Sequence, residues 1–118
     1  MKPSLLLTLG TLALTLTARA QIVFSGSYSN HFDGMGTTGT SYDAGWSGVR
    51  LSDGAAITLA VSSGTSTSGG MFNVGSPGDT DRALGSLASA STVSRFGVGL
   101  LNLTGALVTQ LTLSGVME

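Results

Sequence analysis

The chain has 118 residues, a formal net charge of −1, 18 glycines and no cysteine. After residue 20 it contains no lysine, and its arginines are Arg50, Arg82 and Arg95, which are too few and too scattered to form a nucleic-acid-binding patch. The lack of cysteine excludes disulfides and makes a structural zinc site improbable, and the length allows one small domain.

The first twenty residues have the features of a secretory signal peptide. Lys2 provides a positive start, Leu5–Thr17 is apolar, and Ala18–Ala20 places small residues at the positions that signal peptidase recognises. A short transmembrane anchor is the alternative, but the apolar run is below the roughly 20 residues that span a bilayer. We therefore expect a mature chain beginning at Gln21, with no membrane span after cleavage, that is extracellular, periplasmic or at the cell surface.

Short apolar segments follow, and they alternate with turn-forming clusters of glycine, serine, asparagine and aspartate. The period-two pattern predicts strands at Ile22–Tyr28, Trp46–Ser52, Ala56–Ser62, Gly69–Gly75, Arg95–Leu101 and Leu107–Gly115. Ala83–Ser91 is the one stretch after the signal that tolerates a helix. Strands at this spacing predict an all-β fold, an antiparallel β-sandwich or jelly roll, over residues 21–118.

Gly34, Gly36 and Gly39 match the G-x-G-x-x-G spacing of dinucleotide-binding loops. The match lacks its structural context, because a polar segment precedes it and no helix pattern follows it. We expect no nucleotide ligand, and we interpret these glycines as a turn between the first strand and the strand that opens at Trp46.

Two pairs of residues are candidates for ligand binding. Tyr42 and Trp46 could stack on the sugars of an extracellular glycan or matrix component, although a single tryptophan more often fills a core. Asp79 and Asp81 could bind Ca²⁺, the one ion we consider, with backbone carbonyls. The alternative for this pair is an Asx turn at Asp79 and an ion pair between an acid such as Asp81 and Arg82.

The sequence indicates no catalytic residues. His31 is the only histidine, and no serine lies in a G-x-S-x-G motif. We therefore predict a non-enzymatic structural or binding module. The alternative is part of a polysaccharide-acting hydrolase, which would need Asp33 or Asp43 to share a cleft with Asp79 or Asp81.

Three segments together resemble an uncharacterised family of exported bacterial proteins. They are "FDGMGTTGTSYDAGW" from Phe32, "SGGMFNVGSPGDTDRALGSLAS" from Ser68 and "FGVGLLNLTGALVTQLTLSGVME" from Phe96. The resemblance implies a concanavalin-like or jelly-roll β-sandwich at the cell surface or in the matrix, often followed by a PEP-CTERM-type sorting signal. It implies no activity. Because family members continue beyond the equivalent of Glu118, we expect this domain to be truncated.

Overall fold

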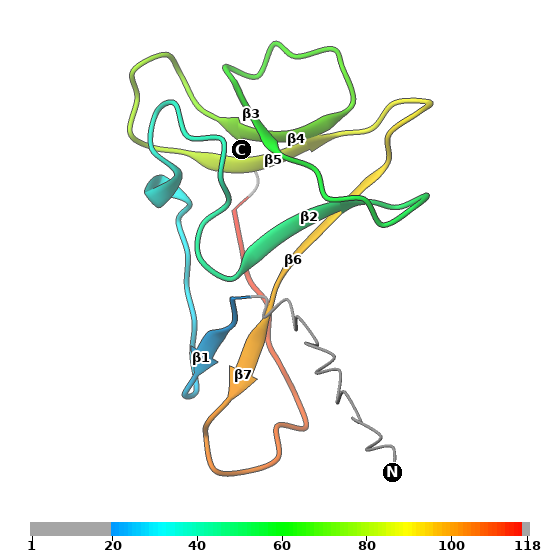
Figure 1. Cartoon of the computed structure of the whole chain (residues 1–118). Helices are drawn as coiled ribbons and strands as arrows, with labels where there is room; N and C mark the ends of the chain where they lie inside the picture. The colour runs from blue at the N-terminus through cyan, green and yellow to red at the C-terminus, as the bar shows by residue number, and fades with distance from the viewer. Residues whose placement is uncertain (1–19, 117–118) are drawn as a thin grey trace, which may run out of the picture.

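The computed structural model describes residues 20–116, so the predicted signal peptide lies almost entirely outside the described residues. The described chain contains seven strands and one 3₁₀-helix (Figure 1): β1 Ile22–Phe24, η1 Asp33–Met35, β2 Trp46–Arg50, β3 Leu59–Ser62, β4 Gly70–Val74, β5 Ala83–Leu87, β6 Ser94–Val98 and β7 Leu100–Asn102. The expected all-β character is confirmed. No helix within residues 20–116 is long and apolar enough to cross a membrane.

The strands pair in three small sheets. β2 pairs with β6 and β4 with β5 in antiparallel register, but β1 pairs with β7 and β3 with β4 in parallel. The prediction of a wholly antiparallel arrangement is therefore wrong. The parallel pairing of β3 with β4 is possible because β3 has only four residues. The connection formed by residues 63–69 is long enough to return the chain to the level at which β3 begins.

The core lies where β3 and β4 meet the segments before and within β2. Met35, Leu59 and Met71 are buried together, and Phe32, Tyr42, Ile57 and Leu84 pack around them. Gly48 in β2 allows this approach, because a Cβ atom there would lie 3.2 Å from Met71 Cγ and would overlap the Tyr42 hydroxyl. The β2–β6 ladder thus turns one face towards the three-stranded sheet.

The glycine-rich segment before β2 forms the predicted turn. Gly34 lies in η1, and Gly36, which follows it, has a φ of +65°, a conformation that favours glycine. Gly39 lies so close to the Met35 carbonyl that a side chain would overlap it. Glycine is therefore required here by local turn geometry.

One strand was missed from the sequence and one predicted strand is wrong. The helix-tolerant stretch Ala83–Ser91, for which no strand was predicted, contains β5 at Ala83–Leu87, because its backbone completes the ladder with β4. Leu107–Gly115 forms no strand despite its period-two pattern (Figure 1). A strand needs a hydrogen-bonded neighbour, and none of the described residues supplies one to this segment.

Candidate functional site

Trp46 belongs to a partly buried aromatic cluster. Its indole N–H donates to the Tyr28 hydroxyl at 2.8 Å, and its ring meets Phe32 edge-to-face at a centroid distance of 4.9 Å. Phe96 lies further away, at 6.4 Å. Phe32 has a φ of +64°, which is unusual for a bulky residue, and its N–H donates to Asn30 Oδ1 at 2.7 Å. The hydrogen bond to Asn30 stabilises the positive φ of Phe32, the residue whose ring contacts Trp46.

Tyr42 lies in a different environment. Its ring packs against the buried core cluster, and its hydroxyl donates to the Ile57 carbonyl oxygen at 2.7 Å. Burial raises the pKa of the Tyr42 hydroxyl above its ordinary value of 10.0. Phe32 packs against the same core cluster and also meets the Trp46 ring, so it lies between the Tyr42 and Trp46 environments.

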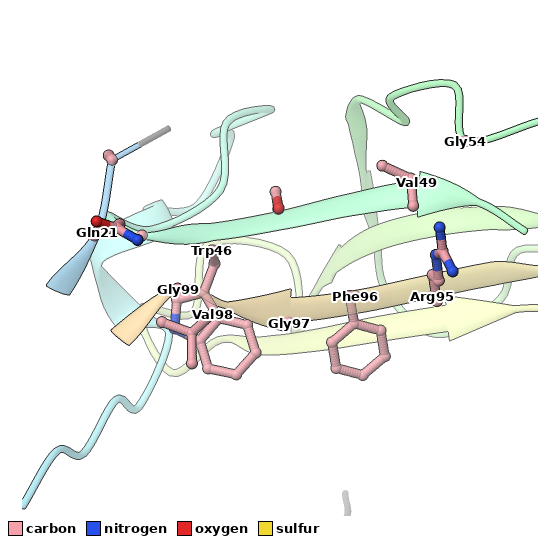
Figure 2. Close-up of a pocket in the computed structure, with 12 residues that line it drawn as sticks. Gln21, Trp46, Val49, Gly54, Arg95, Phe96, Gly97, Val98 and Gly99 are labelled. Atoms are coloured by element: carbon pink, nitrogen blue, oxygen red, sulfur yellow. The ribbon is translucent and has the colours of Figure 1, made fainter. Parts of the chain in front are cut away.

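An open groove of about 680 Å³ runs along the β2–β6 ladder (Figure 2). Trp46 and Phe96 project from one side of the ladder, whereas Val49 projects from the other. Twelve residues line the groove, and none of them is acidic: Ala20, Gln21, Gly45, Trp46, Ser47, Val49, Gly54, Arg95, Phe96, Gly97, Val98 and Gly99.

The chemistry of this groove comes from exposed backbone and a few polar groups. A Cβ atom at Gly97 would meet nothing within 4 Å, so the middle of β6 has open space above it. Ser47 and Gln21 add neutral hydrogen-bonding groups, Val49 adds apolar surface, and the exposed Arg95 adds positive charge. Such a surface suits a polar ligand with hydroxyl groups and an apolar face.

The predicted calcium residues Asp79 and Asp81 lie in the exposed turn between β4 and β5. The Asp81 N–H donates to Asp79 Oδ1 at 3.1 Å, which is the Asx turn considered from the sequence. The alternative ion pair with Arg82 is absent, because Arg50–Asp53 at 2.8 Å is the only ion pair within residues 20–116. No group of three acidic, histidine or cysteine residues that could hold a metal occurs in that range.

Three acids of the hydrolase alternative have contacts within the fold. Asp33 Oδ1 accepts the Arg82 backbone N–H at 3.0 Å, and the Asp43 carboxylate lies against Gly34, where a Cβ atom would come within 2.6 Å of it. Asp79 serves the Asx turn. Asp79 is held by a local turn, whereas Asp33 is held by a long-range contact that brings it beside the residue that follows Asp81.

A buried polar network is the feature that sequence reasoning missed. Arg82 is 2% exposed and Asn73 is fully buried. Arg82 Nε donates to Asn73 Oδ1 at 2.7 Å, and its Nη2 donates to the Asn73 carbonyl oxygen at 2.8 Å. Asn73 Nδ2 in turn donates to the carbonyl oxygens of Gly36 and Gly39 at 2.8 and 3.0 Å.

This network joins β4, the residue just before β5 and the loop after η1. Gly75 makes room for it, since a Cβ atom there would overlap the Arg82 guanidinium. The only sequence signal for it is an arginine beside an apolar strand, and such a residue is also compatible with the surface ion pair that we considered. Its three segments meet only in the folded chain.

Comparisons with protein-family models, curated proteins and solved structures found no match to this chain.

Proposed function

We propose that this chain is an exported, non-enzymatic binding module with a β-sandwich architecture, and that it binds an extracellular glycan in the groove along β2 and β6. The observation that carries the proposal is the groove's floor, where Gly97 leaves backbone exposed beside Ser47, Val49 and Arg95. Sugar rings combine hydroxyl groups with apolar C–H faces, so neutral polar groups next to a small apolar side chain complement them.

Trp46 lines the groove, but its side chain projects from the side of the ladder opposite Val49, and Tyr42 does not line the groove. The Trp46 ring therefore adds no stacking surface beside Ser47 and Gly97, and its indole N–H is already bonded to Tyr28. Tyr42 packs against the core, and its hydroxyl donates a hydrogen bond to the Ile57 carbonyl oxygen. Export rests on the signal-like residues 1–20.

Binding of the purified protein to a polysaccharide array, with and without Ca²⁺, tests the proposal. Gly97→Leu should fill the groove without a steric clash, because the space above Gly97 is open, and it should weaken binding by about tenfold or more. Ser86→Leu is the matched control, since Ser86 is an exposed position of β5 that does not line the groove. The control should bind like the unmodified chain.

The possible outcomes separate the parts of the proposal. Binding to no polysaccharide would reject the glycan-binding function. Equal binding by Gly97→Leu and the unmodified chain would reject the groove as its location. A calcium-dependent rise in melting temperature that is lost in Asp79→Asn would place an ion at the β4–β5 turn, where the Asp79 side chain now bonds Asp81.

A further inference from the structure

β6 and β7 form one long strand edge. The Gly99 N–H donates to the Gly45 carbonyl oxygen, and the Gly99 carbonyl accepts from the Ile22 N–H, at 3.1 and 2.8 Å. The N–H and C=O of one strand residue point to the same side, so β2 and β1 both lie on that side of residues 94–102. Figure 1 shows β6 and β7 as successive parts of this run.

The opposite side of residues 94–102 is an open edge. The bonds Leu51–Val93, Gly45–Gly99 and Phe24–Leu103 show that odd-numbered residues point their backbone groups towards β2 and β1. The even-numbered residues therefore point theirs the other way: Ser94, Phe96, Val98, Leu100 and Asn102. Within residues 20–116, the sheets that contain β6 and β7 have two strands each, so no third strand covers this side. An uncovered edge of this length is a template for another strand.

The segment 107–116, which we call the tail, has the composition of the missing strand. Leu107, Leu111 and Leu113 recur on one face of an extended chain, and they are 86%, 57% and 90% exposed. No charged residue occurs between Phe96 and Met117, so neither β7 nor the tail opposes pairing by charge. The edge and the tail also match in length.

The turn between β7 and the tail keeps the tail off its own edge. In a tight hairpin the Ala106 carbonyl would accept the Asn102 backbone N–H. Here that carbonyl accepts the Asn102 side-chain amide at 2.8 Å and the Thr104 hydroxyl at 3.1 Å. The Asn102 Oδ1 atom further accepts the Thr104 N–H at 3.0 Å. Side chains thus occupy the first position of the hairpin ladder.

We propose that the tail of one copy adds as a strand to the β6–β7 edge of a second copy, and that the second copy returns its tail in the same way. Each chain carries one unpaired edge and one unpaired apolar strand of similar length, so a reciprocal exchange satisfies both elements in both chains. The result is a strand-exchanged homodimer. The exchange uses the edge of the ladder, whereas the groove residues Ser47 and Val49 lie on one of its faces; Phe96 and Val98 belong both to the edge and to the lining of the groove.

Sedimentation equilibrium of the mature chain, which begins at Gln21, from about 1 to 100 μM tests this proposal. The expected result is a concentration-dependent doubling of its molecular mass. Leu111→Lys combined with Leu113→Lys, which we call the tail variant, should abolish the doubling. Gln110→Lys combined with Thr112→Lys adds the same charge to the other face of the tail, and it should dimerise at least tenfold more strongly than the tail variant. A monomer at every concentration, or equal association by these two double variants, would overturn the proposal.

A mixing experiment distinguishes exchange from other contacts. Val98→Pro removes an N–H that faces the open edge and leaves the hydrogen bonds to β2 in place. It should be monomeric alone but should form a heterodimer with the tail variant, since one intact tail then meets one intact edge. Leu100→Pro is a second edge variant, to be used if Val98→Pro loses native Trp46 fluorescence. Failure of every folded edge variant to pair with the tail variant would show that the tail is not the donated strand.

Discussion

Replacing Arg82 by methionine tests whether the buried polar network stabilises the fold. Methionine keeps much of the arginine volume but cannot donate a hydrogen bond. The change leaves Asn73 Oδ1 and the Asn73 carbonyl without their Arg82 donors, in a residue that has no exposed surface. The substitution therefore isolates the hydrogen bonds from the packing.

The expected loss follows from these two acceptors. Asn73 Oδ1 is left without its Arg82 donor, which costs about 1–3 kcal/mol, whereas the Asn73 carbonyl faces β3 in the parallel ladder and loses only one hydrogen bond, worth about 0.5–1.5 kcal/mol. Removing a buried charge offsets part of that loss, because the guanidinium no longer has to be desolvated. We expect a decrease in the free energy of unfolding of about 2–4 kcal/mol, a large share of the roughly 5–15 kcal/mol typical of a small domain.

Urea unfolding followed by Trp46 fluorescence measures the change. Arg95→Met is the matched control, because Arg95 is exposed on β6, and it should lie within about 0.5 kcal/mol of the unmodified chain. Arg82→Lys keeps the charge but lacks the planar fork, so it should also be destabilised. If Arg82→Met were as stable as Arg95→Met, the network would not stabilise the fold and the reasoning would be refuted.

Three further predictions concern the loop, the core and one surface ion pair. Gly39→Ala should lower the free energy of unfolding by more than about 1 kcal/mol in urea titrations, because its Cβ atom would overlap the Met35 carbonyl. Tyr42→Phe should cost about 1 kcal/mol, since it removes the hydrogen bond to Ile57. Burial raises the pKa of Tyr42. The stability that this shift contributes is therefore fully present below the pKa of the unfolded chain and is lost as the pH rises through the pKa of the folded chain. Thermal melts between pH 9 and 12 should show a fall in melting temperature in the unmodified chain and a smaller fall in Tyr42→Phe. Hydrogen bonding from the Ala55 N–H, and then the charge of Arg50, lower the pKa of Asp53. The stability contributed by the Asp53 carboxylate is therefore lost as the pH falls through that lowered pKa. Asp53→Asn should reduce the dependence of the melting temperature on pH in the acid range.

Local sequence patterns predict several strands of this fold well. The expected strands at Trp46–Ser52 and Gly69–Gly75 correspond to β2 at Trp46–Arg50 and β4 at Gly70–Val74. Both segments are bounded by turn residues; Met71 of β4 lies in the core, and Gly48 of β2 lies against it. The Asx turn at Asp79 could also be predicted from the sequence, because an aspartate side chain in a turn commonly accepts the backbone N–H two residues later.

Long-range pairing explains most of what the sequence does not predict. β5 contains alanine, glycine and serine, which tolerate a helix, and it becomes a strand because β4 supplies a ladder beside it. The tail shows the opposite case, since its alternation is strong but no described strand lies against it. Likewise, the Arg82 network depends on Asn73 and the Gly36 and Gly39 carbonyls meeting in space.

The two faces and the free edge of the β2–β6 ladder have different roles. Its inner face carries Gly48 against the core, its outer face carries Val49 and the groove, and the far edge of β6 carries unpaired backbone groups. The two faces of a strand present side chains and its two edges present backbone groups, so a substitution that alters one face need not alter pairing at an edge. Filling the groove at Gly97 should consequently leave dimerisation unchanged, and charging the tail at Leu111 and Leu113 should leave the affinity of each groove for glycan unchanged. If either change affected both properties, the groove and the exchanged strand would have to be parts of a single interface.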